Sequence, residues 1–391
     1  MFELSQDHED FRASVRDFAE REVEPHVAQW DKDHHLPLEV VQRMGDLGLF
    51  GLVVPERWGG SAETVDGVVQ SDFTALCVAI EELGRVDQSI GITLSAGVGL
   101  GINPILTYGT DEQRDRWLPD LVAGRALAGF GLTEPDAGSD AGGTRTTATR
   151  DGDEWVIKGA KSFITNSGTD ITSLVTVTAR TGTTAEGRAQ ISAIIVPSGT
   201  PGFTVEEPYD KLGWHISDTH GLTFDGCRVP GSAVLGEVGR GFQQQMKQFV
   251  IERMFAAYSA IGQCNHALER TREYIAQRTV FGKPLAERQY VAFRLTELQA
   301  KVDLLRSHNL QTCEALLAGE DITRMASIGK LTAGRLVREV ADTCMQFHGG
   351  MGYIEETWTA RFMRDTRLGS IGGGADEVML QVLARLDGLP A

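Results

Sequence analysis

Apolar residues in the N-terminal part of the chain recur at helical spacing. One series lies between charged residues and predicts a surface helix with a single buried stripe. Its members are Phe11, Val15, Phe18 and Val23. A second helix is predicted from Phe73 to Leu83, with Gly84 as its C-terminal cap. Thr110 and Gln113 have the spacing of a capping box at the start of a third helix.

The period of the pattern changes in the middle of the chain. From Glu154 to Pro230, short runs rich in Val, Ile, Thr and Phe follow one another, such as WVIKG, SLVTVTAR and ISAIIV. Turn-forming pairs separate these runs. They are Asp151-Gly152, Thr181-Gly182, Pro201-Gly202 and Asp225-Gly226. Turns at this density predict a mostly antiparallel β domain.

Helical periodicity returns after the β region. The predicted helices are Phe242 to Tyr274, Tyr290 to Leu317, Ile322 to Phe347 and Glu377 to Leu386. The order helical, β, helical differs from the alternating strands and helices of a doubly wound nucleotide fold. We predict an α+β multidomain protein with an N-terminal helical domain (residues 1–124), a middle antiparallel β domain (125–234) and a C-terminal helical domain (235–391).

Length and charge narrow the possible functions. The 391 residues can bury two or three domain cores. The formal charge of −17 argues against nucleic acid and anionic membranes as partners, since both attract clustered cations. The most apolar window, Ile90 to Leu106, is interrupted by glycines and Pro104, so no membrane insertion is predicted. The histidines lack metal-ligand spacing such as HExxH, so no metal site is predicted.

The cysteines and the first residues predict a compartment. The five cysteines are odd in number and widely spaced, without any CxxC pair, which favours a reducing environment. The chain starts with MFELSQDHEDF, which is acidic where a signal or transit peptide is basic. We therefore predict a cytoplasmic protein.

One predicted helix carries two charges among apolar neighbours. In FVIERMFAAY, every residue except Glu252 and Arg253 is apolar or aromatic, so the helix is predicted to be buried on most sides. Ionised side chains seldom lie in such places unpaired. Two interpretations stay open: an internal ion-pair network, or a carboxylate that faces a cavity.

Two polar clusters lie near the β region. GLTEPDAGSD brings small residues together with the hydroxyls of Thr133 and Ser139, which suits close approach to a ligand. KSFITNSG adds an aromatic face at Phe163 and a hydroxyl at Thr165. Each cluster alone is also typical of a turn or a strand end.

Two further segments lie among the later helices. RTVFGKPLAERQ combines a cation with an aromatic ring, which suits a pyrophosphate and a flat ring system, and QFHGGMG follows a long helix. Surface and capping roles are the alternative for both. The candidates are Arg278, Phe281, Gln289, Gln346, Gly349 and Gly350. GVGLG, residues 97–101, imitates part of a dinucleotide fingerprint, but without a preceding strand the match reads as chance.

With these motifs in this order, the whole chain resembles the acyl-CoA dehydrogenases, a flavoprotein family. The resemblance implies an N-terminal helical domain, a middle β domain and a C-terminal four-helix bundle. It also implies a homotetramer in which FAD lies between the bundle, the β domain and a neighbouring subunit.

The resemblance implies roles for particular residues. Residues lining or covering the flavin ring would be Phe130, Leu132, Thr133, Phe163 and Thr165. Ser139 would touch both FAD and the CoA part of the substrate. The adenine and pyrophosphate would be held by Arg278, Phe281, Gln289, Gln346, Gly349 and Gly350, partly across a subunit boundary, and Glu377 would contact FAD.

The loop in SIGGGADEVML bears on the catalytic base. Many family members carry the base in this loop, at the position of Gly373, and glycine cannot abstract a proton. One subgroup places it on a helix, in a pair that matches Glu252-Arg253. Glu252 is therefore predicted as the base and Arg253 as a neighbour that fixes local charge, with Gly373 and Gly374 at the substrate. Asp376 and Glu377 remain alternative bases, although an acidic helix start is commonplace.

The implied reaction is α,β-dehydrogenation of an acyl-CoA thioester to a trans-2-enoyl-CoA, with electrons passing to an electron-transferring flavoprotein. The alternatives are an oxidase or a flavin monooxygenase on the same scaffold, and a non-catalytic flavin-fold binding protein. The loop pattern resembles citronellyl-CoA-type dehydrogenases, and Gly373 leaves room for branched or terpenoid-like acyl chains.

Overall fold

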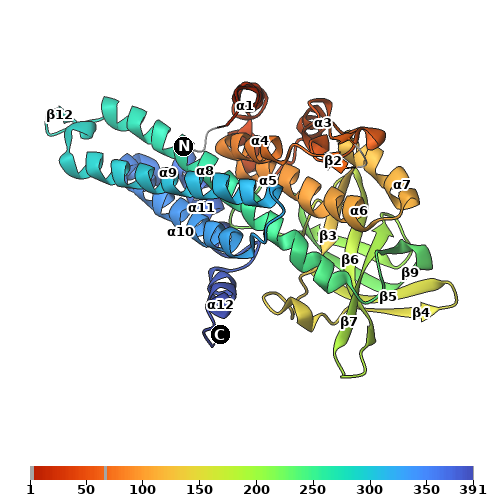
Figure 1. The fold of residues 1–391 in the computed structure, drawn as a ribbon. Coiled ribbons are helices and arrows are strands. Elements are labelled where there is room, and N and C mark those ends of the chain that lie inside the picture. Colours follow the sequence, from red (N-terminus) through yellow and green to blue (C-terminus); the bar gives the residue numbers. More distant parts are fainter. Residues whose placement is uncertain (1–3, 66–67, 391) are drawn as a thin grey trace.

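The chain folds into helices, a β-sheet and a second set of helices, in that order along the sequence (Figure 1). The computed structural model describes residues 4–65 and 68–390. The predicted fold class is confirmed, whereas the predicted domain boundaries after residues 124 and 234 stay predictions. The long helix α8 (Gly241–Gln277) runs from the sheet across the molecule into the bundle.

The N-terminal part is built of short helices around one long apolar stretch. Its α-helices are α1 (Gln6–Phe18), α2 (Val27–Asp33), α3 (Leu38–Asp46), α4 (Phe73–Val86), α5 (Gln88–Ala96), α6 (Asn103–Tyr108) and α7 (Asp111–Val122). A small hairpin, β1 (Glu63–Val65) and β2 (Val68–Gln70), precedes α4. The capping box predicted at Thr110 and Gln113 is present at the start of α7.

The most apolar window forms one continuous helical stretch in spite of the glycines and Pro104 that interrupt its apolar sequence. The π-helical segment η4 (Gly97–Ile102) joins α5 to α6, and Pro104 lies in the first turn of α6, where its missing N–H is tolerated. By length and composition, the stretch Gln88–Tyr108 could cross a membrane, with a mean hydropathy of 1.5. However, 72% of its apolar window is buried inside the fold, which is typical of a core helix.

The spacing predicted that the helix ends at Gly84, and this prediction is wrong. Helix α4 continues through it to Val86. A Cβ at Gly84 would lie 2.5 Å from the hydroxyl of Ser259 on α8. The glycine therefore allows close packing of α4 on α8, a contact between segments distant in sequence.

The middle part is a twisted sheet. Its strands are β3 (Leu127–Gly131), β4 (Thr147–Asp151), β5 (Glu154–Thr165), β6 (Thr172–Thr183), β7 (Ala189–Pro197), β8 (Phe203–Pro208), β9 (Thr219–Pro230) and β10 (Val234–Leu235). They pair in the order β10-β7-β6-β4-β5-β9-β8, and β3 also pairs with β6. Most pairs are antiparallel, as predicted, but β3 and β4 each lie parallel to β6.

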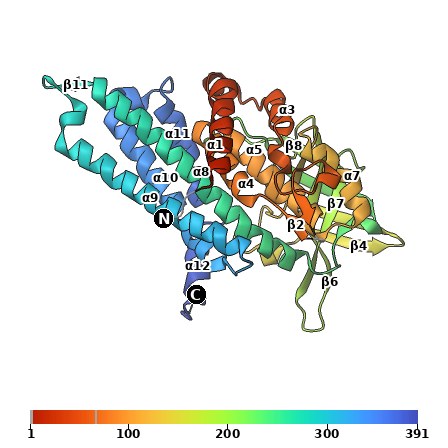
Figure 2. The ribbon, with the colours of Figure 1, turned by 45° about the horizontal axis from the view of Figure 1, so that its top comes forward.

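The C-terminal part adds helices that pack on α8 or on one another. They are α9 (Gln289–Leu317), α10 (Thr323–His348), α11 (Trp358–Thr366) and α12 (Asp376–Leu386). The hairpin β11 (Thr279–Val280) and β12 (Lys283–Pro284) lies at the end of the bundle farthest from the sheet (Figures 1 and 2). The sequence pattern predicted α8, α9, α10 and α12 and missed α11.

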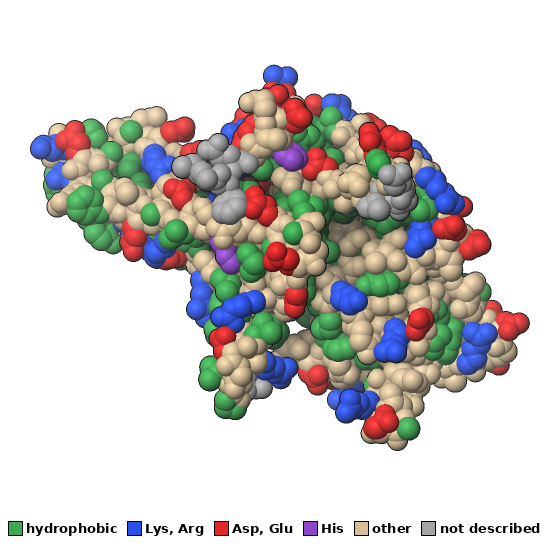
Figure 3. Space-filling model, viewed as in Figure 1, with side chains coloured by type: hydrophobic (Ala, Val, Ile, Leu, Met, Phe, Trp, Pro, Cys, Tyr) green, Lys and Arg blue, Asp and Glu red, His purple; other side chains and the backbone are tan. Residues whose placement is uncertain are grey.

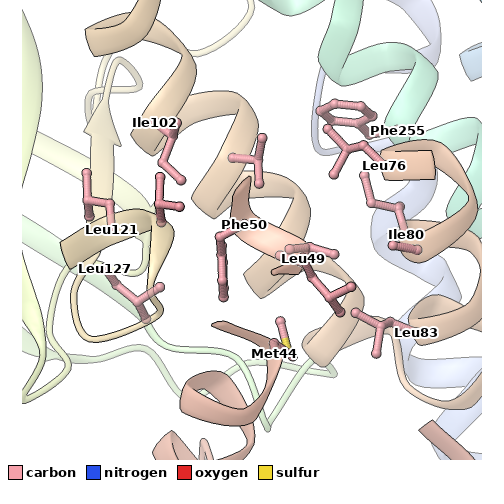
Figure 4. Packing of buried hydrophobic residues seen from close by; sticks show 14 of the residues in the cluster. Met44, Leu49, Phe50, Leu76, Ile80, Leu83, Ile102, Leu121, Leu127 and Phe255 are labelled. Carbon is pink, nitrogen blue, oxygen red and sulfur yellow. The ribbon is translucent and has the colours of Figure 1, made fainter. Parts of the chain in front are cut away.

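The largest apolar core joins the N-terminal helices to α8. Phe255 of α8 points toward Leu76 of α4, while Phe50 lies in the same cluster, between Leu49 and Ile102 (Figure 4). This packing fixes the α8 segment that carries the two charges of the FVIERMFAAY motif.

Candidate active site

The carboxyl group of Glu252 lies in the apolar seam between α8 and η4. The residue as a whole is half-buried, but its Oε1 atom is inaccessible and makes no hydrogen bond among the described residues. Burial raises the pKa of Glu252 to about 8. No ion pair of Glu252 is found within residues 4–65 and 68–390, so the internal ion-pair interpretation is wrong for this side chain.

Gly99 makes room for this carboxyl group. A Cβ at Gly99 would overlap Oε1 of Glu252 and lie 2.8 Å from its carboxyl carbon. The ring of Phe255 would be 3.1 Å from the same Cβ. GVGLG lies within a helical stretch, so it is not a dinucleotide fingerprint, but its central glycine allows the carboxyl group of Glu252 to pack closely. Sequence reasoning missed this role because the partner lies on another helix.

Because Glu252 is predicted as the base, replacing Gly99 by alanine is expected to lower kcat roughly 10- to 100-fold, the effect of a displacement of about 1 Å at a catalytic group. Steady-state rates and thermal stability would be measured together, since alanine ordinarily stabilises a helix by about 1 kcal/mol relative to glycine. Adding Gly99→Ala to Glu252→Gln should cause no further loss if the glycine acts through the carboxyl group. Additive losses would contradict this role.

A cavity of about 480 Å³ reaches the same seam. Gly99, Ile251 and Phe255 line part of it. Glu252 itself is not among the lining residues, but its carboxyl group lies against Gly99. The rest of its wall is mostly apolar and comes from the N-terminal helices. It is formed by Val53, Pro55, Trp58, Val69, Ser71, Phe73, Leu76, Val98, Asn103, Leu106 and Arg114.

Phe163 presents an aromatic face near the C-terminal end of β5. It lies where the pairing of β5 with β9 shifts register, with a φ of 61° that is uncommon for a bulky residue. Its side chain is 65% exposed and lies against Tyr209, with ring centroids 4.9 Å apart. Thr165 follows two positions later on the same strand, paired with Thr219. A strained and exposed aromatic residue fits a site for a flat ring.

The other candidates near the ring site lie on or after β3. Phe130 and Leu132 are buried, Thr133 is half-buried and Ser139 is exposed in the following turn. The carbonyl of Thr133 accepts a hydrogen bond of 2.8 Å from the backbone of Ser162, next to Phe163. The two clusters therefore lie next to each other, at the C-terminal ends of β3 and β5.

A buried ion pair that the sequence did not reveal lies between the same two clusters. Lys161 donates to Glu134 at 2.7 Å, and their side chains are 0% and 4% exposed. The ammonium group also donates to the carbonyl of Leu132 and to the hydroxyl of Thr144. Burial alone would raise the pKa of Glu134, but hydrogen bonds from Lys161, Thr144 and the backbone lower it to about 2. This ion pair therefore joins the GLTEPDAGSD cluster, which contains Glu134, to the KSFITNSG cluster, which contains Lys161.

Arg253 points away from Glu252, toward the bundle. Its Nη1 donates to the hydroxyl of Ser327 on α10 at 3.2 Å, while its buried Nε makes no hydrogen bond. Burial lowers the pKa of Arg253. The arginine therefore does not pair with its neighbour and contributes a second buried charge on the α10 side.

The glycine loop before α12 has space around it. Gly373 has a φ of 63°, and a Cβ there would meet no heavy atom within 4 Å among the described residues. Gly374 also has a positive φ, of 99°. Of the alternative bases, Glu377 is exposed, whereas Asp376 is buried and accepts from Arg335 at 3.4 Å. One buried oxygen of Asp376 makes no hydrogen bond, so it remains an alternative.

The remaining candidates lie at the far end of the bundle. Phe281 is 94% exposed at the tip of the hairpin, with a φ of 51°. Tyr274 stacks on His348, which brings the hairpin end of α8 to the end of α10. The candidates gathered there are Arg278, Gln289, Gln346, Gly349 and Gly350. From Glu252 to Arg278 is roughly 40 Å along α8, so one chain does not bring the two groups together.

Three family models match successive parts of the chain. The N-terminal, middle and C-terminal domains of acyl-CoA dehydrogenase match residues 5–125, 129–227 and 239–386. The chain belongs to the acyl-CoA dehydrogenase family. The prediction that it is an acyl-CoA dehydrogenase, an oxidoreductase, is confirmed.

The relatives of this acyl-CoA dehydrogenase match it over nearly the whole length. A probable acyl-CoA dehydrogenase, YngJ, of Bacillus subtilis is 38% identical, and the match covers 98% of each chain. A short-chain specific acyl-CoA dehydrogenase of Megasphaera elsdenii is 37% identical over 97% of this chain and 98% of its own. The solved structure of butyryl-CoA dehydrogenase from Megasphaera elsdenii superposes with a TM-score of 0.93, at 36% identity and 99% coverage of both chains.

Two further solved structures bear on cofactor and partner. A structure described as the electron-transferring flavoprotein of Acidaminococcus fermentans contains a chain that is 33% identical, with a TM-score of 0.92 and 99% coverage of both chains. A glutaryl-CoA dehydrogenase from Mycobacterium smegmatis, in complex with FADH2, is 30% identical with a TM-score of 0.91 and covers 99% of this chain and 96% of its own.

The residues of this acyl-CoA dehydrogenase fit a flavin. Phe163 is exposed and strained beside the hydroxyl-bearing turn of Thr133, and the unpartnered oxygen of Glu252 lies in an apolar seam. The exposed ring of Phe281 and the nearby positive charge of Arg278 suit the other end of a dinucleotide. The roles of the individual residues stay predictions.

Proposed function

We propose that Glu252 is the base that removes the α proton of the acyl-CoA thioester in this FAD-dependent acyl-CoA dehydrogenase. One observation carries the assignment: a buried carboxyl oxygen that has no hydrogen-bond partner among the described residues and lies against Gly99, a residue that lines the cavity. A general base needs a pKa near the working pH, and burial raises the pKa of Glu252 to about 8. Phe130, Leu132, Thr133, Phe163, Thr165 and Glu377 would hold the flavin side of FAD, and Ser139 would touch FAD and CoA.

The protein's own part in the reaction is to orient the thioester and move one proton. Bound FAD supplies the acceptor for the hydride that leaves the β carbon. Glu252 receives the α proton, and the apolar residues around it, including Phe255, exclude the water that would stabilise its charged form. The backbone amide of Gly373 donates to the thioester oxygen, where negative charge develops. A glycine with positive φ can turn its amide toward a ligand without a side chain in the way.

The direct test is anaerobic mixing of the holoenzyme with acyl-CoA. Loss of the oxidised flavin absorbance together with formation of a trans-2-enoyl-CoA, identified by mass spectrometry, supports the proposal. Flavin that stays oxidised with every acyl-CoA offered would overturn it and favour a binding protein without catalysis.

The rate of flavin reduction is expected to rise with pH. Because burial raises the pKa of Glu252 to about 8, the carboxyl group is mostly protonated at pH 6 and cannot accept a proton. The value of kcat/KM should therefore increase close to tenfold per pH unit well below pH 8 and level off above it. Measurement from pH 6 to 9.5 checks this, and a flat profile in the wild-type enzyme would contradict it.

For the substrate, we propose a branched acyl-CoA. The open space beside Gly373 supports this choice, since no heavy atom of the described residues lies within 4 Å of a Cβ placed there. Terpenoid-like chains of the citronellyl type are an extension of the same idea. The short-chain specific and butyryl-CoA relatives favour a short chain. A panel of straight, 2-methyl, 3-methyl and isoprenoid acyl-CoAs decides: a sole preference for short straight chains would overturn the branched assignment.

For the electron acceptor, we propose an electron-transferring flavoprotein. The similarity to a chain in the structure described by that name supports it. Reduced enzyme should transfer electrons quickly to such a carrier and react slowly with oxygen. Fast reoxidation by oxygen instead would favour an oxidase or a flavin monooxygenase.

We further propose a homotetramer in which a neighbouring subunit completes each FAD site. The candidates at the hairpin lie roughly 40 Å from Glu252 along α8, so a second chain must bring them close. Hydrophobic side chains are exposed at the free end of the bundle and along α12 (Figure 3). Light scattering gives the assembly, and a monomer that binds FAD fully would overturn the shared site.

A cytoplasmic location also remains our proposal. It rests on the five cysteines, all free and buried in the part of the chain that the structure describes. Subcellular fractionation would test it, and recovery from an oxidising compartment would contradict it.

A further inference from the structure

One face of α10 contacts both ends of the glycine loop, which comprises residues 370–375. The residues on this face follow one another at helical spacing, so they form a stripe. They are Ser327, Lys330, Gly334 and Arg338. Each contacts either the loop before α12 or a charged side chain on α8.

The start of the loop is packed directly on the backbone of α10. A Cβ at Gly334 would overlap the carbonyl of Gly369, so only glycine allows this approach. The hydroxyl of Ser370 donates to the carbonyl of Gly334 at 3.2 Å, and Arg338 donates to the same hydroxyl at 3.2 Å. The first residue of the loop is therefore held from two sides.

The end of the loop is held by a lysine. Lys330 is 1% exposed, and its ammonium group donates to the carbonyl of Gly374. Between this tie and Ser370 lies Gly373, which has a φ of 63° and open space around its Cα. The two ties thus present the backbone of Gly373 on the open side of the loop.

Burying a charged ammonium group to hold a carbonyl has an unfavourable free energy. Lys330 makes no ion pair within residues 4–65 and 68–390, and burial lowers the pKa of Lys330 to about 8. Its other charged neighbours include Asp376, Glu377 and Arg253. Burying a charge without an ion pair destabilises a fold. The cost suggests that the charge is kept for a function.

The same stripe reaches the helix of the proposed base. Arg253, next to Glu252 in sequence, donates to Ser327, and its buried Nε has no hydrogen-bond partner within the part of the chain that the structure describes. Ser327 and Lys330 are one helical turn apart on α10. Two buried cations, Lys330 and Arg253, therefore lie near each other, one bound to the end of the glycine loop and the other carried by α8 next to Glu252.

We propose that Lys330 is a positioning residue for dehydrogenation, which holds the Gly373 and Gly374 backbone in place for the thioester oxygen and adds positive charge beneath it. The proposal rests on the function proposed above, in which Glu252 removes the α proton and the amide of Gly373 binds the thioester. A fixed donor and a buried positive charge both favour the enolate more than the neutral substrate. The lysine would thus act on kcat more than on KM.

The test compares Lys330→Met, Lys330→Arg and Val340→Ala in the holoenzyme. Val340 lies on the same helix in the bundle core, away from the loop, and controls for general loss of stability. In Lys330→Met, amides of residues 371–375 should exchange hydrogen at least about tenfold faster. The value of kcat should fall roughly 10- to 100-fold with little change in KM. Lys330→Arg keeps the charge and the donors and should recover part of the loss.

A second readout separates positioning from mere stability. Exchange of the α proton of bound acyl-CoA with deuterium from D2O, measured without oxygen, should slow in Lys330→Met in the same ratio as kcat. Unchanged loop protection, or equal rate losses in Lys330→Met and Val340→Ala, would overturn the proposal. Glu252→Gln should abolish α-proton exchange while leaving loop protection intact. If Glu252→Gln keeps its rate, Glu252 is not the base. Faster hydrogen exchange of the loop in Lys330→Met would then still show that Lys330 holds the loop in place.

Discussion

Replacing Glu252 by glutamine is expected to slow flavin reduction by acyl-CoA by a factor of about 10² to 10⁴, the contribution typical of a general base. Glutamine has nearly the same size and shape, so the seam between α8 and η4 stays filled, but an amide cannot accept the α proton. The residues predicted to hold FAD are separate from this side chain. The purified variant should therefore keep its yellow colour and fail to bleach in stopped-flow mixing with acyl-CoA.

The same variant is expected to be more stable than the wild type at alkaline pH. Burial raises the pKa of Glu252 to about 8, far above its ordinary value of 4.5, so ionising the folded protein has a cost that the unfolded chain does not share. The wild type then loses stability relative to the variant as the pH rises from about 4.5 through 8. Melting temperatures at pH 5 and pH 9 measure the difference, which should widen at pH 9.

Matched carboxyl-to-amide changes at the alternative bases serve as controls. Asp376→Asn and Glu377→Gln alter one atom in the same way, at the start of α12. Glu252 would lose its assigned role if Asp376→Asn stopped α-proton exchange while Glu252→Gln left it intact. Equal stability of wild type and Glu252→Gln at every pH would contradict the burial argument.

Helical periodicity predicted most of the helices. Its error at Gly84 has a cause that lies outside the local sequence. The long helices α8, α9 and α10 bury faces with clear spacing, so the pattern located them to within a few residues. Gly84 was predicted as a cap because glycine commonly ends helices. The reason for this glycine is the hydroxyl of Ser259 on a distant helix, which no local pattern contains.

In the candidate site, too, the sequence revealed local features but not contacts between distant segments. Glu252 stood out because a charge among apolar residues is unusual wherever the chain folds. Its contact with Gly99, and the pair formed by Lys161 and Glu134, depend on which segments meet, so spacing could not reveal them. A lysine in an alternating strand pattern reads as exposed, and only the sheet shows that Lys161 faces inward.

Replacing Lys161 by methionine is expected to destabilise the fold by about 3–5 kcal/mol, because it leaves the buried carboxylate of Glu134 without its cation. The carbonyl of Leu132 and the hydroxyl of Thr178 would also lose a donor. These groups lie directly under the strand end and turn that carry Thr133. Loss of FAD should therefore accompany the loss of stability, and denaturant unfolding with flavin fluorescence measures both.

Three comparisons make the Lys161 prediction specific to the buried pair. Lys158→Met removes an exposed lysine from the same strand and should change stability by less than about 0.5 kcal/mol. Adding Glu134→Gln to Lys161→Met should recover part of the loss, since no unpaired charge then remains buried. Hydrogen bonds lower the pKa of Glu134 to about 2, so its stabilising contribution is present above about pH 4.5 and fades as the pH falls toward 2. The wild-type advantage over Lys161→Met should shrink over that range, and an advantage that is constant down to pH 2 would show that the ion pair is not its source.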